Sequence, residues 1–313
     1  MFTRTTQLIG SDGFRALQEA RVIIFGVGGV GGWCAESLLR TGIGHLTIVD
    51  FDVVDRTNLN RQVVATHDNI GQSKVIEMQK RLLSICPEAD VQTIELQYNA
   101  DTAASFNLAQ YDIVVDAIDM VECKALLLYN ATHAGCKVFS SMGAGRKLNP
   151  LTIRTAEFWK VQGCPLARAL RTRIKKEKLL PASKIQCVYS EEIAGDQGTI
   201  APVVGVFGMT LAAMVIEHIC STKSQKFTSS TSTTSLTSFL LEWCGVSTAF
   251  TPTGAAVAGA TTDYCSFTTD RATHTRLIGF HLTDNLCGHL FEFIQELLRL
   301  EVPTLDFTEF LLP

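Results

Sequence analysis

A short apolar run followed directly by a cluster of glycines constrains the fold of this chain more than any other feature. Residues 21–25 (RVIIF) are typical of a buried parallel strand, and Gly26, Gly28, Gly29 and Gly31 follow in the motif GVGGVG. Glycines here let the backbone approach an anionic ligand, and the free N–H groups at the start of the next helix face that ligand. The segment therefore predicts a strand, a phosphate- or dinucleotide-binding loop and a helix.

Strand and helix signals alternate along the first two thirds of the chain. The predicted strands are short and apolar, and two of them end at an acidic residue, Asp50 and Asp116. This alternation predicts an α/β fold with a doubly wound, mainly parallel, Rossmann-like sheet. We expect further strands at 46–49, 113–115 and 138–141, and helices from the glycine motif to about residue 40, at 73–85 and at 121–134.

The longest uncharged apolar run, residues 200–216, is close to the lower length limit for a membrane span. It contains Pro202, Gly205 and Gly208 and lies among segments that are typical of a folded domain. We interpret it as a buried core helix and expect no obligatory membrane contact.

Composition changes sharply after this predicted core helix. Residues 227–238 contain ten serines or threonines in twelve positions, a composition that cannot build a hydrophobic core. We place the domain boundary near this tract and divide the chain into a first domain, 1–220, and an extension, 221–313. Residues 284–300 have the spacing of an amphipathic helix, and no pattern assigns a role to the extension.

Ten cysteines stand singly along the chain, and none is paired in a C-x-x-C motif. This spacing disfavours a structural zinc site or a redox dithiol and favours reduced thiols in a cytosolic protein. Residues 1–20 carry charges and lack the apolar core of a secretory signal, so we expect a cytoplasmic location. The net charge of −4 gives no overall sign of nucleic-acid binding, which must then rest on a local patch.

Charged residues after the second strand point to the chemistry. Asp50 is placed to accept hydrogen bonds from ribose hydroxyls, which fits NAD as well as ATP. Arg61 and Lys74 separate the two, because adenylation expels pyrophosphate, whose growing negative charge two cations stabilise, whereas hydride transfer needs neither. Asp119 suits Mg²⁺, which favours one or two carboxylates together with phosphate oxygens. Singly, the two cations could be solvated surface charges and Asp119 a helix cap.

The order of these motifs resembles the adenylation domain of the ThiF family, whose members adenylate a carboxylate with ATP and usually act as homodimers. The motifs are the glycine cluster, Asp50, N-x-x-R-Q at 58–62, G-x-x-K at 71–74 and D-x-x-D at 116–119. The resemblance implies that ATP and Mg²⁺ bind here, and it leaves a monovalent cation as a further option. It places in the nucleotide site the four glycines, Asp50 with the ribose, Asn58, Arg61 and Lys74 with the phosphates, and Asp119 with the metal. Asp52 and Gln62 complete the set of candidate nucleotide-binding residues.

A further arginine completes the catalytic residues that the resemblance implies. In relatives, an arginine near the N-terminus reaches into the site of the neighbouring subunit, and Arg4 is the candidate for this role here. The candidate catalytic residues are therefore Arg4, Arg61, Lys74 and Asp119.

Several segments favour one branch of the family, which dehydrates threonylcarbamoyladenosine beside the anticodon of tRNA. The similarity covers roughly residues 2–219, and the segments are TGIG at 41–44, TNLNRQ at 57–62, SMGAG at 141–145, CPLARALR at 164–171 and CVYSEE at 187–192. This branch implies carboxylate adenylation followed by ring closure, with tRNA as partner, and related enzymes also occur in mitochondria. The basic run predicts contacts with tRNA phosphates through Arg168, Arg171, Arg173, Lys175 and Lys176, with a solvated helix face as the alternative.

Three other functions remain open at this level. An activating enzyme for a ubiquitin-like or sulfur-carrier protein shares the ATP site, but it usually has a reactive cysteine where Ala194 stands here. A non-catalytic scaffold of the same fold and a nicotinamide oxidoreductase are the other two. Cys187 is the one cysteine near the expected site, either as a nucleophile with a lowered pKa or as a structural thiol, and a sulfur-transfer partner remains unassigned.

Overall fold

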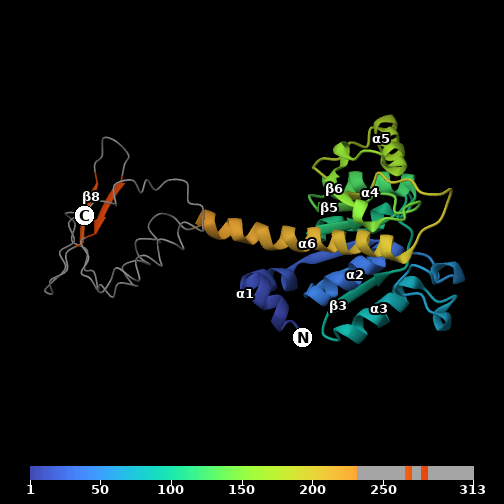
Figure 1. Cartoon of the computed structure of the whole chain (residues 1–313), viewed down its shortest axis with the longest axis horizontal. Coiled ribbons are helices and arrows are strands. Elements are labelled where there is room, and N and C mark those ends of the chain that lie inside the picture. The colour runs from blue at the N-terminus through green and yellow to red at the C-terminus, as the bar shows by residue number, and fades with distance from the viewer. Residues whose placement is uncertain (231–264, 270–275, 281–313) are drawn as a thin grey trace. The chain divides into compact units, whose positions relative to one another are not determined.

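A seven-stranded sheet forms the centre of the unit Met1–Ser230 in the computed structural model (Figure 1), which describes residues 1–230, 265–269 and 276–280. The strand order is β3-β2-β1-β4-β5-β7-β6, and every pairing is parallel except that of β6 with β7. The strands are β1 (Arg21–Phe25), β2 (His45–Val49), β3 (Asp90–Ile94), β4 (Ile113–Asp116), β5 (Lys137–Ser141), β6 (Arg154–Glu157) and β7 (Gln186–Tyr189).

Helices cover both faces of this sheet. The helices are α1 (Thr3–Glu19), α2 (Gly29–Thr41), α3 (Lys74–Ile85), α4 (Val121–His133), α5 (Pro165–Glu177) and α6 (Ala201–Ser230). Short 3₁₀ turns lie at Arg56–Asn58, His67–Asn69, Ala103–Ser105, Leu108–Gln110, Pro150–Thr152 and Phe158–Lys160. Alternation along β1 separates two cores, since Val22 and Ile24 pack with α1, α2, α3 and α6, whereas Ile23 and Phe25 pack with α4 and α5.

The strand order reverses direction beside β1. From β1 the chain builds outward to β2 and β3 on one side and then returns to β4 and β5 on the other. In doubly wound sheets, ligands bind outside the carboxyl ends of the strands at such a switch point. The fold therefore directs attention to the loops after β1, β2 and β4.

The doubly wound, mainly parallel sheet predicted from the sequence is confirmed. The predicted strands and helices between residues 21 and 141 are all present, and α2 ends at Gly42 in the left-handed conformation typical of a helix C-terminus. The sequence patterns did not reveal the first helix, α1, nor the strands β3, β6 and β7. The structure thus adds three strands, of which β3 and β6 form the two edges of the sheet, and an N-terminal helix to the predicted fold.

The apolar run at 200–216 lies in α6, the long helix that Figure 1 shows beside α2. Among the described residues, Ala201–Ser221 is the one helical stretch long and apolar enough to cross a membrane, and half of it is buried within the fold. Val203, Phe207 and Leu211 belong to the core on the α2 side of the sheet. These contacts agree with a core helix.

The domain boundary stays a prediction. Helix α6 continues to Ser230 and so crosses the boundary that we placed between residues 220 and 221. In the unit Thr231–Pro313, the described residues form two antiparallel strands, β8 (Cys265–Thr269) and β9 (Arg276–Phe280). The helix predicted at 284–300 lies outside the described residues.

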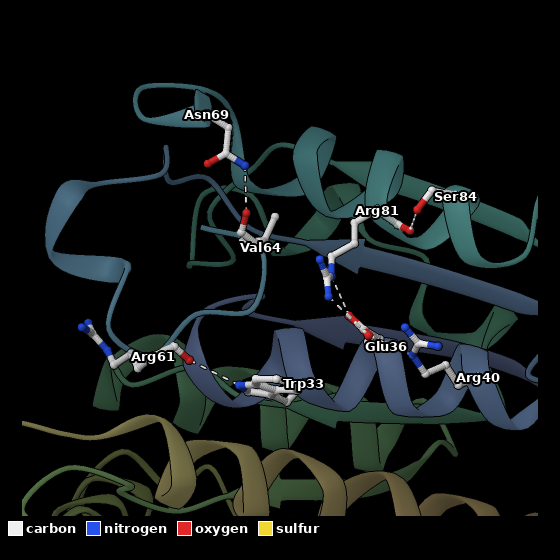
Figure 2. Close-up of polar contacts among 8 residues, drawn as sticks. All are labelled: Trp33, Glu36, Arg40, Arg61, Val64, Asn69, Arg81 and Ser84. Carbon is white, nitrogen blue, oxygen red and sulfur yellow. Dashed lines mark hydrogen bonds and ion pairs between the residues drawn. The ribbon is translucent and has the colours of Figure 1, made fainter. Parts of the chain in front are cut away.

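A buried carboxylate joins α2 to α3 on one face of the sheet (Figure 2). Glu36 of α2 accepts hydrogen bonds from Arg40 Nε at 2.8 Å and from Arg81 Nε of α3 at 2.6 Å. Burial by itself raises the pKa of the Glu36 carboxyl, but the two arginines outweigh it and hold that pKa below its ordinary value. Glu36 is therefore a charged link between two helices that both start at the switch point.

Candidate nucleotide-binding site

A cavity of about 660 Å³ opens at the carboxyl edge of the sheet, at the switch point between β1 and β4. Its size falls within the range usual for small-molecule sites. The cavity brings together ten residues predicted from the sequence, namely Gly26, Gly28, Gly29, Asp50, Asp52, Asn58, Arg61, Gln62, Lys74 and Asp119. The predicted set thus converges on one place, although its members come from three separate connections, which follow β1, β2 and β4.

The glycine loop requires glycine at two points for steric reasons. Gly26 has a φ of +85°, and a Cβ there would lie 2.8 Å from the carbonyl oxygen of Ala117. A Cβ on Gly31 would lie 1.8 Å from the carbonyl oxygen of Gly26. Gly31 does not line the cavity, so its part is close packing of α2 against the loop, and the remaining glycines expose the backbone to a ligand.

Asp50 fixes the loop that faces it. One carboxylate oxygen accepts the N–H of Val27 at 2.8 Å, and the other accepts the N–H of Asp52 at 2.9 Å. Burial raises the pKa of the Asp50 carboxyl above its ordinary value, although both N–H groups and the charge of Lys74 oppose the rise. Each oxygen keeps a second lone pair, so a ribose hydroxyl can still bind.

The loop that carries Arg61 is held against α2. Trp33 Nε1 donates to the Arg61 carbonyl at 3.3 Å, while Figure 2 shows the guanidinium directed away from Trp33. Its Nη1 donates to the carbonyl of Thr57 at 2.8 Å and to Asn60 Oδ1 at 2.9 Å. The Asn60 amide also donates to the carbonyl of Thr199, another cavity residue. The Arg61 backbone is therefore fixed, and its head group is held only by groups at the protein surface.

Asn58 organises the same loop from its start. Its side-chain oxygen accepts the N–H of Asp55 at 3.0 Å, and the Asp55 carboxylate accepts the N–H of Thr57 at 2.7 Å. These reciprocal bonds form a capping box around the 3₁₀ turn Arg56–Asn58. With Oδ1 occupied, the Asn58 amide nitrogen remains as the side-chain donor toward an anionic ligand.

Lys74 is the first residue of α3 and is almost completely buried, with 5% of its surface exposed. Its ammonium donates to the Asp52 carboxylate at 2.7 Å, and its backbone N–H donates to the Asp52 carbonyl at 3.0 Å. An exposed lysine side chain would adopt many rotamers, whereas the Lys74 side chain has a fixed position beside the cavity. The surface-charge alternative therefore does not fit Lys74.

Asp119 lies in the loop between β4 and α4 and is exposed toward the cavity. Its carboxylate forms no hydrogen bond or ion pair with any part of the chain that the structure describes. The N-cap of α4 is Met120, and no side chain caps that helix. The alternative role of Asp119 as a helix cap is therefore wrong, and the carboxylate remains available to a ligand.

Arg4 is not brought to this cavity in its own chain. It lies in the first turn of α1, and α1 ends at Glu19, directly before β1 begins at the opposite edge of the sheet. Any part that Arg4 plays in catalysis must therefore come from another copy of the chain.

The basic helix α5 divides the predicted tRNA-binding residues into two groups. Arg171 donates to the carbonyls of Phe158 and Val161 at 3.1 and 2.8 Å, and Arg173 pairs with Glu122 at 2.6 Å. These two arginines hold α5 to neighbouring segments. The residues of the second group are exposed, and they are Arg168, Lys175 and Lys176.

Two features of the site were not predicted. Thr199 lines the cavity from the segment before α6, and its hydroxyl is buried without a hydrogen-bond partner. Lys124, in the first turn of α4, is fully buried and pairs with Asp116. A lysine inside the apolar helix predicted at 121–134 was the signal available for Lys124, whereas nothing in the sequence distinguishes Thr199.

The structure argues against Cys187 as a nucleophile. Cys187 is fully buried in β7 and does not line the cavity, and burial raises the pKa of its thiol far above its ordinary value. A thiolate nucleophile requires the opposite shift. Across the described ranges, no three His, Cys, Asp or Glu side chains cluster to hold a metal by themselves. Cys187 is a structural thiol.

Comparison with known proteins places the chain in a family. A sequence profile of the ThiF family matches residues 2–251. The chain belongs to the ThiF family. This ThiF-family chain is 36% identical to the tRNA threonylcarbamoyladenosine dehydratase of Bacillus subtilis over 191 residues, which cover 61% of the chain and 74% of the relative.

Solved structures of an enzyme with that name resemble this ThiF-family chain over about seven tenths of its length. The crystal structure of the Escherichia coli enzyme TcdA with AMP has a TM-score of 0.69 and 32% identity, and the match covers 71% of this chain and 95% of that chain. The same enzyme with ATP has a TM-score of 0.67 at 32% identity, over 72% of this chain and 95% of that chain. ATP binding is thus supported by fold, sequence and cavity together.

Proposed function

We propose that this chain is an ATP-dependent tRNA threonylcarbamoyladenosine dehydratase that adenylates a carboxylate. The observation that carries the proposal is the convergence of Arg61, Lys74 and Asp119 on one cavity beside a glycine loop. A hydride-transfer site needs no such set, whereas a leaving pyrophosphate needs positive charge close to it. The name of its relatives and their complexes with ATP and AMP support the same reading.

The contacts already described support one arrangement of the bound nucleotide. Asp50 accepts from the ribose hydroxyls, and the backbone N–H groups at the start of α2 face the phosphates. Lys74 and Arg61 stand beside the glycine loop, and Arg61 exchanges its bonds to Thr57 and Asn60 for bonds to phosphate oxygens. Charge-assisted bonds of this kind are stronger than the neutral bonds that they replace.

The residues present fit a Mg²⁺ ion. The Asp119 carboxylate faces the cavity and has no partner in the described chain, and one carboxylate with phosphate oxygens is a usual Mg²⁺ environment. Bound there, the ion would neutralise charge on the phosphate oxygens. No residue of the described ranges is assigned to a monovalent cation.

The reaction then needs no protein nucleophile. An oxygen of the threonyl carboxylate attacks the α-phosphorus of ATP, the bond between the α- and β-phosphates breaks, and pyrophosphate leaves. A nitrogen of the same modified nucleoside attacks the activated carbonyl carbon and loses a proton, and the carbon–oxygen bond to AMP breaks. The ring closes with net loss of water. Because the nucleophile is tethered to the carbonyl, effective molarity supplies much of the acceleration.

The exposed cations of α5 are the proposed tRNA contacts. Arg168, Lys175 and Lys176 are exposed, and the Lys175 ammonium lies 5.8 Å from the ring centre of Trp159, which is itself 41% exposed. Cations bind phosphates, and an exposed aromatic ring accepts an unstacked base. Arg171 and Arg173 contribute to the folded helix rather than to the tRNA.

Assembly and location follow the family. In a homodimer, Arg4 of one copy completes the site of the other, since it does not reach the cavity of its own chain. We place the enzyme in the cytoplasm, with mitochondrial association as the alternative setting.

The decisive experiment is mass analysis of tRNA incubated with the protein, ATP and Mg²⁺. We expect the modified adenosine to lose the mass of one water, and ATP to yield AMP and pyrophosphate. Unchanged tRNA would overturn the proposal. ATP–pyrophosphate exchange that responds to a small protein ending in Gly-Gly, and not to tRNA, would instead identify an activating enzyme for a ubiquitin-like or sulfur-carrier protein.

A further inference from the structure

A buried ion pair lies directly behind the loop that carries Asp119. Lys124 of α4 and Asp116 of β4 are both fully buried, and the ammonium is 2.7 Å from the carboxylate. Removing two charges from water is costly, and apolar residues of similar volume often replace such a pair without loss of stability. Core packing alone therefore does not account for a lysine at this position.

Both members of the ion pair form hydrogen bonds with the backbone of one residue, Ile118. Lys124 Nζ donates to the carbonyl of Ile118 at 2.9 Å, and the Asp116 carboxylate accepts the N–H of Ile118 at 3.1 Å. Ser140 of β5 completes the set by donating to Asp116 at 2.6 Å. Both backbone polar groups of Ile118 are thus committed, and its carbonyl belongs to the peptide plane that leads into Asp119.

The same loop is confined on its other side by the glycine loop. The carbonyl of Ala117 lies so close to Gly26 that a Cβ on that glycine would be 2.8 Å from it. The backbone N–H of Ala117 also donates to the Phe25 carbonyl at 2.8 Å. The segment before Asp119 is therefore held between the phosphate-binding loop and Lys124.

We propose that Lys124 is a positioning residue, which through Asp116 and Ile118 holds the Asp119 carboxylate at the cavity for a metal–nucleotide complex. This inference rests on the proposed function, since it takes Asp119 as the metal ligand. Lys124 touches neither nucleotide nor metal. It acts by fixing the peptide before Asp119, as outer-shell partners fix metal ligands elsewhere.

The test removes both charges together, so that no lone charge is left buried. In the double variant Lys124→Met with Asp116→Asn, the asparagine oxygen still accepts from Ile118, whereas the Ile118 carbonyl loses its donor. We expect a melting temperature close to that of the wild type. We expect the Mg²⁺ concentration for half-maximal ATP binding, measured by calorimetry, to rise about 10-fold or more, the usual cost of losing an outer-shell partner. ATP affinity in EDTA should not change.

Two further measurements keep the inference falsifiable. Amide hydrogen exchange over residues 116–120 should become faster in the double variant, and Ser140→Ala should shift the Mg²⁺ requirement in the same direction by less. Equal losses of ATP affinity with and without Mg²⁺ would indicate a structural role and overturn the inference, as would an unchanged Mg²⁺ requirement. Failure of the proposed function is distinguishable, because the wild-type protein would then show no Mg²⁺-dependent ATP binding or no change in tRNA.

Discussion

The cavity at the carboxyl edge of the sheet and the basic helix α5 both looked like ligand sites in the sequence, yet the structure uses their charges differently. In the cavity, Lys74 is buried and fixed, and Asp119 faces the open space without a partner among the described residues. On α5, Arg171 and Arg173 are bound to other parts of the fold, and only some of the cations remain exposed. Several motifs that follow one another in a fixed order along the sequence thus predict a binding site better than a run of like charges does.

The largest effect should follow from removing a fixed cation of the cavity. Lys74→Met should slow ATP–pyrophosphate exchange about 100- to 1,000-fold, because a preorganised charge beside the leaving group is lost. Folding should change little, since the remaining partner, Asp52, is half-exposed. Arg56→Ala is the matched control, an exposed cation of the neighbouring loop that does not line the cavity. Equal exchange rates for the two variants would contradict the proposed role of Lys74 in the cavity.

The exposed cations of α5 should matter for tRNA and not for ATP. Lys175→Glu with Lys176→Glu should weaken tRNA binding about 10-fold and flatten its salt dependence, because fewer phosphates are neutralised. Filter binding at several salt concentrations measures both quantities. Arg15→Glu with Lys80→Glu, on α1 and α3, changes the net charge equally and should leave tRNA binding close to wild type. The same loss in both double variants would assign the effect to net charge.

Arg171 should report on stability instead. Arg171→Ala leaves two backbone carbonyls without their donor and should lower the free energy of unfolding by about 1–2 kcal/mol. Lys176→Ala, on the same helix but exposed, should stay within about 0.5 kcal/mol of wild type. Urea denaturation followed by circular dichroism measures both. If Arg171→Ala weakens tRNA binding without a change in stability, the division of α5 is wrong.

The smallest effect concerns pH and Asp50. An ordinary aspartate has a pKa of about 4. Because burial raises the pKa of the Asp50 carboxyl, this group takes up a proton at a higher pH than an ordinary aspartate does. Protonation removes an acceptor of the ribose hydroxyls, so ATP affinity should decline on acidification. Calorimetry at a series of decreasing pH values should show a steeper decline for wild type than for Asp50→Asn, because the asparagine side chain does not titrate. Parallel curves would remove Asp50 from the ribose site.

The sequence predicted the central strands because their apolar runs are continuous and end at glycine or acidic residues. Strand β6 (RTAE) forms the edge of the sheet beyond β7 and carries charge at both ends, so periodicity gives it no signal. Helix α1 escaped prediction because Gly10 interrupts it with a φ of +74°. Tertiary contacts, which no local pattern contains, formed both elements.

In the candidate site, too, local sequence patterns predicted some features and tertiary contacts determined the others. Residues in ordered motifs, such as Asp50 and Lys74, were predicted with their place in the cavity. What the sequence could not reveal was the use of each charge, because it depends on partners distant along the chain. Arg173 meets Glu122 across 51 positions, and Lys147 meets the carbonyl of Glu192 across 45. Spacing alone does not contain such pairs.

The link through Glu36 has a consequence for how the cavity keeps its width. Helix α2 begins at Gly29 and α3 begins at Lys74, and Glu36 meets Arg81 about two turns, or some 10 Å, behind those two starting points. Glu36 therefore joins the two helices at a point that lies away from the nucleotide site. Without the carboxylate, α2 and α3 would lose this charged link. A substitution of Glu36 can therefore weaken nucleotide binding although Glu36 does not line the cavity.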